Sequence, residues 1–291
     1  MKQILKFIYK NIPFKTVVFK GVRMFRLPES IYKHLYFKGV FRVKIKRDQT
    51  FQINHYGFQV ENDIFWSGLF GRWEKDSLLL WSRLCEKSDV IFDIGANTGV
   101  YSLIAKAVNK NNNVYAFDPV KRVYEKLVQN IELNNYDIKP YQIALSNNTG
   151  VAKIYDTDSE HTYSVTVNKN LNTTKSKVTE IDIETLRLDE FIPLNNINKI
   201  DLMKIDVETH EPEVLEGMGK YLRNYKPTLL IEILNDEIAG KIECLIQDLD
   251  YIYFNLNEQG SIQKVDSLTK SDYHNFLICT TAVALDLNLL D

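Results

Sequence analysis

The chain has 291 residues, of which 45% are hydrophobic and 25% charged, so it is long enough to build one large or two smaller domains around an apolar core. Its three cysteines, Cys85, Cys244 and Cys279, are far apart and lack CxxC spacing, which argues against a disulfide framework and a zinc site. No apolar run reaches the roughly 18–20 residues that a membrane span needs. We therefore expect a soluble protein of the reducing cytoplasm.

The net charge of −2 conceals a basic N-terminus. Residues 1–47 contain thirteen lysines and arginines against one acidic residue, Glu29, and so carry about +12. Aromatic and aliphatic side chains stand among these cations, a mixture that suits peripheral contact with an anionic membrane surface, here the inner face of the membrane. A solvated basic arm and a dimer contact are the alternatives. Nucleic acid is a weaker one, because no recognised RNA-binding module is present.

The first elements along the chain are short. Residues 40–65 alternate enough to predict two or three antiparallel strands, and residues 74–86 predict a helix. We therefore predict a basic α/β extension over residues 1–73, followed by a separate domain over residues 74–291.

A regular alternation of strands and helices begins at residue 90. Strands are predicted at 90–95, 113–119, 139–146, 200–208 and 228–234, and helices at 99–108, 121–134, up to about 225, and 236–249. Two late strands, 251–256 and 275–282, suggest an antiparallel hairpin at the sheet edge. Such alternation implies a doubly wound, mostly parallel, Rossmann-like α/β sheet. An insertion at 150–190 interrupts the pattern, and long connections of this kind are often functional.

The clearest motif is DIGANTG, residues 93–99, between a predicted strand and helix. Gly95 and Gly99 allow a tight turn at the carboxyl end of a strand, where doubly wound sheets bind ligands. The dinucleotide fingerprint GxGxxG is absent, and Asp93 precedes the turn instead. A carboxylate there suits the cationic groups of S-adenosylmethionine better than a pyrophosphate. The alternative is an ordinary turn in which Asp93 caps the following helix.

Two further groups of charged residues follow predicted strands. Asp118 ends the second strand, where an acid can accept hydrogen bonds from both ribose hydroxyls, or can simply cap the next helix. Lys204, Asp206 and Glu208 alternate along the fourth strand and so share one face. Burying three charges on an apolar strand is costly without partners. They form either a structural ion-pair network or, together with His210, the lining of a cleft beside the transferred group.

Together these motifs resemble the FkbM family of methyltransferases over roughly residues 74–235. The resemblance rests on DIGANTG, the Asp118–Pro119 pair, TLRLDEF (185–191), KIDVE (204–208), PTLLIEI (227–233) and a helix bearing Leu127, Asn130, Leu133 and Asn134. It implies a class I methyltransferase fold with a seven-stranded sheet and an antiparallel edge strand. It also implies that S-adenosyl-L-methionine is the cofactor, with Asp93, Gly95, Asn97, Asp118 and Asp206 lining its cleft. We add Ala96, Thr98 and Gly99 of the same turn.

The sequence departs from the family pattern at two positions. The glycine usual after KIDVE is replaced by Thr209, which leaves the acceptor side of the site open to variation. The acid before Pro119 is aspartate rather than the commoner glutamate, which shortens its reach to the ribose.

The family resemblance implies methylation of a hydroxyl oxygen, and we expect a sugar acceptor in a glycan or natural-product pathway. An RNA methyltransferase is the first alternative, although the NPPY-like signature for base amines is absent where KIDVE stands. A non-catalytic cofactor-binding module is the second. An alcohol acceptor must lose a proton, for which His210 and Asp206 compete, with Glu208 beside them.

The remaining candidates have weaker signals. Glu232, at the tip of the fifth strand, and His161, in the insertion, are assigned to the acceptor side, although a loop histidine is more often idle. Glu74 is expected to fold over the cofactor, unless it only favours the start of a helix. A divalent ion held by Asp206, Glu208 and Glu232 is conceivable, but we expect no metal. The sequence leaves the oligomeric state open.

Overall fold

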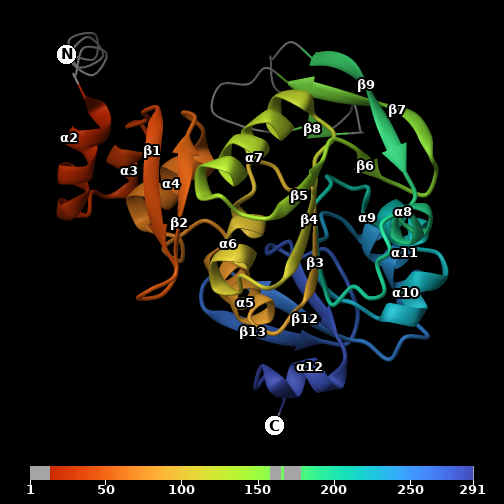
Figure 1. The fold of residues 1–291 in the computed structure, drawn as a ribbon. Coiled ribbons are helices and arrows are strands. Elements are labelled where there is room, and N and C mark those ends of the chain that lie inside the picture. Colours follow the sequence, from red (N-terminus) through yellow and green to blue (C-terminus); the bar gives the residue numbers. More distant parts are fainter. Residues whose placement is uncertain (1–13, 158–164, 167–177, 291) are drawn as a thin grey trace.

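The computed structural model describes residues 14–157, 165–166 and 178–290. The chain starts with an extension of short elements (Figure 1). These are α2 (Lys15–Val22), the 3-10 helix η1 (Arg23–Phe25), α3 (Glu29–Tyr32), β1 (Gly39–Lys44), β2 (Thr50–His55) and α4 (Gln59–Ser67). β1 and β2 pair in antiparallel fashion as a separate two-stranded sheet.

The third strand allowed for within residues 40–65 is wrong, because that segment forms helix α4. Its consecutive residues Ile64, Phe65 and Trp66 are all buried. A strand points successive side chains to opposite faces, whereas a helix packed on two sides can bury neighbours in sequence.

An eight-stranded sheet forms the centre of the molecule, with the order β13-β12-β14-β11-β10-β3-β4-β5. Its strands are β3 (Val90–Ile94), β4 (Asn113–Phe117), β5 (Ile138–Tyr141), β10 (Leu202–Ile205), β11 (Thr228–Glu232), β12 (Ile252–Asn257), β13 (Ser261–Val265) and β14 (Asn275–Cys279). β5, β4, β3, β10 and β11 are parallel, and β14 runs antiparallel between β11 and β12. The predicted doubly wound α/β fold is confirmed. The sheet has one strand more than expected, β13, which is the antiparallel edge strand.

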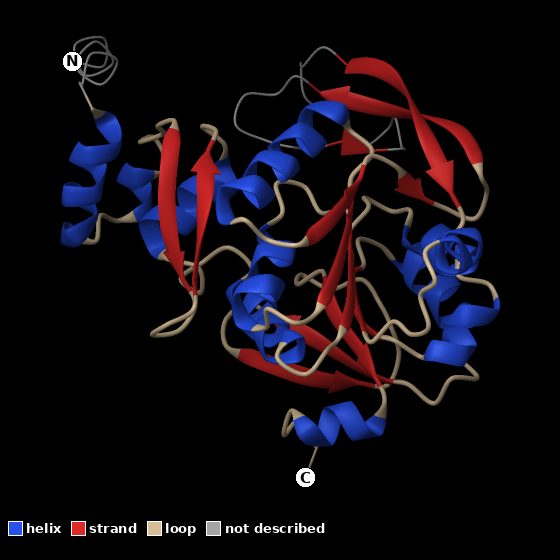
Figure 2. Cartoon of the chain, viewed as in Figure 1, coloured by secondary structure: helices blue, strands red, loops and turns tan. Residues whose placement is uncertain are grey.

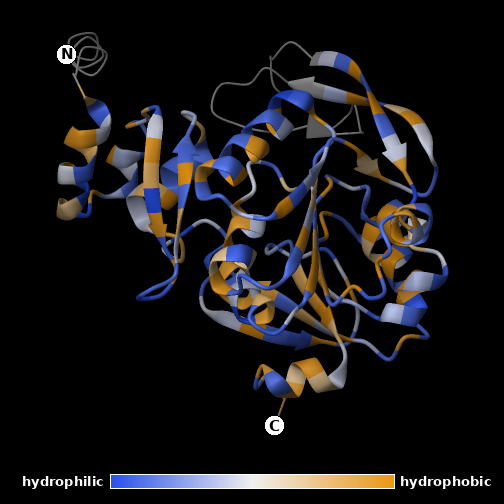
Figure 3. Ribbon diagram, in the orientation of Figure 1, coloured by the Kyte–Doolittle hydropathy of each residue, from blue (hydrophilic) through white to orange (hydrophobic). Residues whose placement is uncertain are grey.

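Helices cover both faces of this sheet (Figures 1 and 2). One face carries α5 (Lys75–Cys85), α6 (Val100–Val108), α7 (Lys121–Asn134) and α12 (Thr281–Asp286). The other carries α8 (Leu188–Leu194), α9 (Glu211–Gly217), α10 (Lys220–Tyr225) and α11 (Asp236–Ile246). Along β3, Ile91 packs into the first layer and Phe92 into the second, as the two-residue period of a strand requires. Hydrophobic residues therefore dominate the central strands (Figure 3).

The insertion forms a third sheet beside the carboxyl ends of the central strands. Its order is β6-β9-β7-β8, with β6 (Ala144–Leu145), β7 (Gly150–Thr157), β8 (Val165–Thr166) and β9 (Val178–Leu186). The strand predicted at 139–146 is therefore divided: β5 belongs to the central sheet, and β6 pairs with β9 of the insertion.

The helix predicted up to Tyr225 is also divided, into α9 and α10. Gly219 separates them with a φ of 52°, a left-handed conformation that interrupts helical hydrogen bonding. Helices α8 and α12 and strand β13 were not predicted. Within the described ranges, no helix is long and apolar enough to cross a membrane.

The extension packs directly on the rest of the chain. Phe41, Ile53 and Phe65 share one apolar cluster with Leu78 and Leu103 of α5 and α6. The proposed division at residue 73 stays a prediction, and the shared core shows that the two parts bury surface against each other.

Candidate active site

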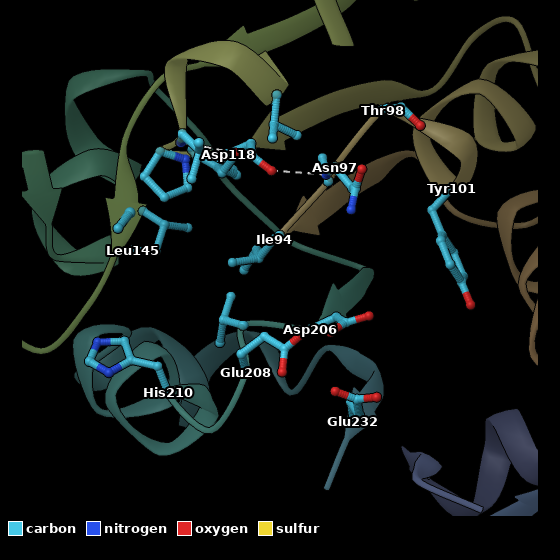
Figure 4. Close-up of a pocket in the computed structure, with 18 of the residues that line it drawn as sticks. Ile94, Asn97, Thr98, Tyr101, Asp118, Leu145, Asp206, Glu208, His210 and Glu232 are labelled. Carbon is cyan, nitrogen blue, oxygen red and sulfur yellow. Dashed lines mark hydrogen bonds between the residues drawn. The ribbon is translucent and has the colours of Figure 1, made fainter. Parts of the chain in front are cut away.

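A cavity of about 420 Å³ lies at the carboxyl ends of β3, β4, β10 and β11 (Figure 4). Its size is in the range of small-molecule sites. The residues that line it come from α4, the β3–α6 turn, the end of β4, the insertion and the ends of β10 and β11. This is the edge at which doubly wound sheets bind ligands.

The turn after β3 forms the floor of the cavity. The amides of Gly95 and Ala96 both donate to the carbonyl oxygen of Phe117, at 3.0 and 2.9 Å. A Cβ on Gly95, whose φ is 79°, would lie 1.8 Å from the Asp206 carbonyl oxygen. A Cβ on Gly99 would lie 2.6 Å from Leu127. The space that these glycines leave is therefore filled by the protein itself rather than by a ligand.

Asp93 lies below this turn and outside the cavity lining. Its Oδ2 accepts hydrogen bonds from the Ser102 amide at 2.9 Å and the Ser102 hydroxyl at 2.5 Å. Burial raises the pKa of Asp93 to about 6, although the Ser102 hydrogen bonds oppose the shift. The geometry matches the helix-capping alternative for Asp93. Gly99 is likewise absent from the lining.

Asp118 and Asn97 face the cavity together (Figure 4). The Asp118 carboxylate accepts from the Asn97 amide at 3.1 Å and the Val120 amide at 2.9 Å. Burial raises the pKa of Asp118 to about 7 against these hydrogen bonds. Asn97 has a φ of 52°, and its buried Oδ1 has no hydrogen-bond partner among the described residues.

Asn130 and Asn134 of α7 hold the turn and the extension together. The Asn130 amide nitrogen donates to the Thr98 carbonyl at 2.9 Å, and its oxygen accepts from the Asn54 amide at 2.9 Å. Asn134 accepts from the Gln52 amide and donates to the Gln52 carbonyl, at 2.7 Å each. The paired asparagines of the sequence motif thus fix β2 and the glycine turn against one helix.

A buried cation supports the acidic side of the cavity. The Lys204 ammonium lies 3.2 Å from the Asp206 carboxylate and 5.2 Å from the centre of the Tyr101 ring. Burial disfavours the charge on Lys204, but the neighbouring carboxylates of Asp206, Glu74 and Glu232 outweigh it and raise the lysine pKa. The predicted structural ion pair is confirmed for Lys204 and Asp206. Asp206 also lines the cavity, as the alternative prediction has it.

Two further carboxylates reach the same corner. Glu74 accepts a 2.5 Å hydrogen bond from the Tyr101 hydroxyl, and its pKa is raised by burial. The pKa of Glu232 is raised first by burial and then by the negative charge of Asp206. Figure 4 shows Glu232 and Asp206 close together below Tyr101. This corner favours protonated carboxyls or a bound cation.

Glu208 follows Asp206 in a strained turn. Glu208 and Thr209 have φ values of 55° and 81°, and positive φ is exceptional for a β-branched threonine. The Glu211 carboxylate holds the turn by accepting from the Val207 amide at 3.1 Å and the Thr209 amide at 3.2 Å. Burial and then the charge of Asp206 raise the pKa of Glu208 to about 7. Among the described residues, none donates a hydrogen bond to the Glu208 carboxylate.

His210 is the N-cap residue of α9 and lies on the opposite side of Glu208 from Glu232 in the view of Figure 4. Its Nε2 lies 3.0 Å from the Ser146 hydroxyl, and its Nδ1 lies 3.6 Å from Glu213. Burial lowers the pKa of His210, so the imidazole is neutral at pH 7. His210 is thus held towards the insertion and away from the group formed by Glu74, Asp206 and Glu232.

The insertion supplies an apolar wall. Ile154 of β7 and Ile183 of β9 pack with Val120 and Val123 at the start of α7, and all four line the cavity. The sequence predicts an insertion here, but a single sequence does not show over which part of the central sheet that insertion folds.

Most of the predicted site residues meet in this one cavity. Glu74, Gly95, Ala96, Asn97, Thr98, Asp118, Asp206, Glu208, His210 and Glu232 all line it. His161 lies outside the described residues. Sequence reasoning missed Trp73, Tyr101 and Glu211, whose only signal is their proximity to the motifs. Over the described part of the chain, no group of three or more His, Cys, Asp or Glu residues is placed to hold a metal ion.

This sheet order, with a glycine turn after its first strand and an acid after its second, is that of a class I methyltransferase. The match of residues 93–255 to the methyltransferase FkbM domain narrows the class to a family. The chain belongs to the FkbM family of methyltransferases.

Individual relatives resemble part of the chain. The hexuronic acid methyltransferase AglP of Haloferax volcanii is 29% identical over 153 residues, which are 53% of this chain and 59% of AglP. Methyltransferase sdnD of Sordaria araneosa is 26% identical over 185 residues, 54% of this chain and 71% of that protein. The crystal structure of methyltransferase FkbM from Methylobacillus flagellatus matches with 15% identity and a TM-score of 0.42, covering 66% of this chain and 43% of that one.

Proposed function

We propose that this chain binds S-adenosylmethionine in the cavity and transfers its methyl group to a hydroxyl of a sugar. The observation that carries the proposal is one cavity that joins two unlike halves. One half has Asp118, Asn97 and an apolar wall, and the other has Asp206, Glu208 and Glu232. The first half can bind a nucleoside through its acid and its apolar wall. The carboxylates of the second half can bind a cationic group and accept hydrogen bonds from hydroxyls.

The residues present fit the cofactor. Asp118 is placed at the end of β4 to accept from ribose hydroxyls, and Val120, Ile154 and Ile183 offer apolar surface to the adenine. Asn97 lines the same half of the cavity as Asp118. The carboxylates around Lys204 suit the positive charge of the methionine part. When bound, S-adenosylmethionine supplies an electrophilic methyl group on a sulfonium.

Two observations support a sugar hydroxyl as the methyl acceptor. One relative is named as a hexuronic acid methyltransferase. The carboxylates in the second half of the cavity can accept hydrogen bonds from sugar hydroxyls. The described lining contains several acidic residues and no lysine or arginine. A sugar that carries its own carboxylate would find no cationic partner there. We therefore propose a neutral sugar, which differs from the acceptor in the relative's name.

Glu208 is the proposed general base. Its carboxylate is free of hydrogen bonds from the described residues, lines the cavity, and has a pKa near 7. A base of that strength is half deprotonated at neutral pH and can accept the hydroxyl proton on a carboxylate oxygen. Asp206 is already paired with Lys204, which orients it. Most of the remaining rate enhancement would come from holding the acceptor in line with the methyl group.

His210 is the second candidate for the base. It is neutral at pH 7 and lines the cavity, but its Nε2 is engaged with Ser146. It would have to release Ser146 before accepting a proton from an acceptor.

The test is a methyl-transfer assay with isotopically labelled S-adenosylmethionine against neutral sugars and sugar nucleotides, their uronic acid counterparts and RNA. We expect label on the neutral sugars, with turnover on the uronic acids at least about tenfold lower, since an unpaired buried charge costs more than about 1.4 kcal/mol. Label only on RNA would replace the proposal with the RNA alternative. Cofactor binding without transfer to any acceptor would favour the non-catalytic alternative.

A further inference from the structure

The outer side of the N-terminal extension carries an exposed apolar stripe. Phe14, Val17, Val18, Met24 and Phe25 are 83%, 69%, 41%, 83% and 80% exposed. With Gly21 they follow the spacing i, i+3, i+4, i+7 and onward through α2 and η1, so they share one side of a continuous helical segment. Figure 3 shows orange, apolar stretches on α2 at the margin of the molecule. We call these five residues the α2 stripe.

The opposite side of the same segment faces the protein. Phe19 is buried against Phe37 and Trp66, with ring centroids 6.0 and 5.5 Å apart. The Arg23 guanidinium lies 5.2 Å from the centre of the Phe65 ring. The orientation of α2 is therefore set by packing, and the α2 stripe is what remains outside. Soluble surfaces scatter single apolar residues, so five in one stripe need an explanation.

Exposed cations stand on the same segment of the chain as the α2 stripe. Lys20, Arg26, Lys33 and Lys38 are exposed, and Glu29, the one acidic residue among residues 1–47, forms an ion pair with Arg72. An amphipathic helix with aromatic and aliphatic residues on one side and lysine or arginine at its margins is suited to lie in the interface of an anionic bilayer.

We propose that the α2 stripe inserts into the surface of an anionic membrane, with the flanking lysines and arginines on lipid phosphates. A second copy of the chain fits less well, because a two-fold contact through the stripe would bring Lys20 and Arg26 of both copies together. RNA fits less well because phosphates do not need an aliphatic stripe. This surface is separate from the cavity, so the proposal stands independently of the proposed function.

The experiment is flotation of the full-length chain with phosphatidylcholine vesicles that contain either no anionic lipid or about 30% phosphatidylglycerol, at about 50 and 500 mM salt. We expect binding to the anionic vesicles at low salt and less binding at high salt. The double variant Met24→Ser, Phe25→Ser should lower the partition coefficient at least about tenfold, since burial of two large apolar side chains in the bilayer is lost. Lys20→Gln should lower it about fivefold.

The matched control is Val151→Ser, Leu194→Ser, which removes two apolar side chains that are 72% and 75% exposed but lie outside the extension. It should float as the wild type does. Circular dichroism melting and S-adenosylmethionine affinity should be unchanged in all variants, which separates loss of the surface from loss of the fold.

Three results would overturn the proposal. The first is no binding to anionic vesicles at low salt. The second is binding that the Met24→Ser, Phe25→Ser variant retains in full. The third is self-association in sedimentation experiments that the same variant abolishes while vesicles bind nothing, which would assign the stripe to a second copy of the chain.

Discussion

The two halves of the cavity differ in how their polar groups are satisfied. At the ends of β3 and β4, Asp93 is bonded to Ser102, and Asp118 to the amides of Asn97 and Val120. At the ends of β10 and β11, by contrast, Glu208 accepts no hydrogen bond from the described residues. Burial raises the pKa of a carboxyl in both halves, to about 7 for Asp118 and for Glu208. In the first half, the hydrogen bonds to the carboxylates come from the protein itself. In the second half, the Glu208 carboxylate is left for a ligand to pair.

This difference indicates which half of the cavity is ordered by the protein before a ligand binds. A cofactor that a whole enzyme class shares has one fixed structure. It can therefore be bound by a turn whose hydrogen bonds are formed before the cofactor arrives. Acceptors differ, and Glu208, which we propose to meet the acceptor, stands on a strained turn held by Glu211. Strain of that kind gathers at functional sites. The comparison predicts that substitutions in the first half alter stability and cofactor affinity, and substitutions in the second alter turnover.

Removal of the proposed base should have the largest effect. Glu208→Gln should lower kcat by about 10²–10⁴-fold and leave cofactor affinity nearly unchanged. A base acts when deprotonated, so wild-type activity should rise with pH around the Glu208 pKa of about 7, and the variant should lose that rise. The control is Glu216→Gln on the exposed side of α9. A rise that persists in Glu208→Gln and disappears in His210→Asn would transfer the role to His210.

Crowding of the glycine turn comes next. Gly95→Ala places a Cβ against the Asp206 carbonyl at a positive φ, so we expect a loss of about 2–4 kcal/mol in unfolding free energy from overpacking and backbone strain together. Gly240→Ala in α11, where a Cβ meets nothing within 4 Å, should instead raise stability by about 0.5–1 kcal/mol. Equal stability of the two variants in denaturant titrations would show that the turn and the end of β10 are not in contact.

A charge change at the end of β4 should have an intermediate effect. Asp118→Asn keeps one of the two hydrogen bonds from the backbone amides and removes the charge, so S-adenosylmethionine should bind with about 1.5–3 kcal/mol less free energy. Asn keeps the fold, which a melting curve can verify. Unchanged affinity in calorimetry would remove Asp118 from the cofactor site.

Relief of strain should have the smallest effect. Thr209 has a φ of 81°, so Thr209→Gly, which restores the residue usual in the family, should stabilise the protein by up to about 1–2 kcal/mol. Thr50→Gly in β2 should do the opposite, because a glycine in a strand costs about 0.5–1 kcal/mol. A destabilised Thr209→Gly variant would show that the side chain of Thr209 contributes more than its backbone strain costs.

The sequence was sufficient for the elements whose signals are local. Strict alternation and the glycine turn placed β3, α6, β4 and α7 within a residue or two, and the spacing of charges along 204–208 placed Asp206 and Glu208 in the cavity. Family motifs also identified the asparagines of α7, although not that Asn130 and Asn134 join the extension to the glycine turn.

The remaining features depend on contacts between distant segments. Asp93 was assigned to the cofactor because it precedes the turn, but its side chain points to Ser102, a direction that periodicity does not determine. The wall from Ile154 and Ile183 requires knowing where the insertion folds, and α4 required knowing that two surfaces pack against residues 59–67. Each of these depends on tertiary packing rather than local propensity.

The most direct test of the account is calorimetric titration of the protein with S-adenosylmethionine at pH 7, in two buffers with different heats of ionisation. Burial and neighbouring negative charge leave carboxyls of the cavity partly protonated, with a pKa of about 7 for Asp118 and a raised pKa for Glu232. A cation lowers those pKa values, so binding should be saturable, one to one, and accompanied by proton release. Absence of binding, or binding that takes up protons, would contradict the account.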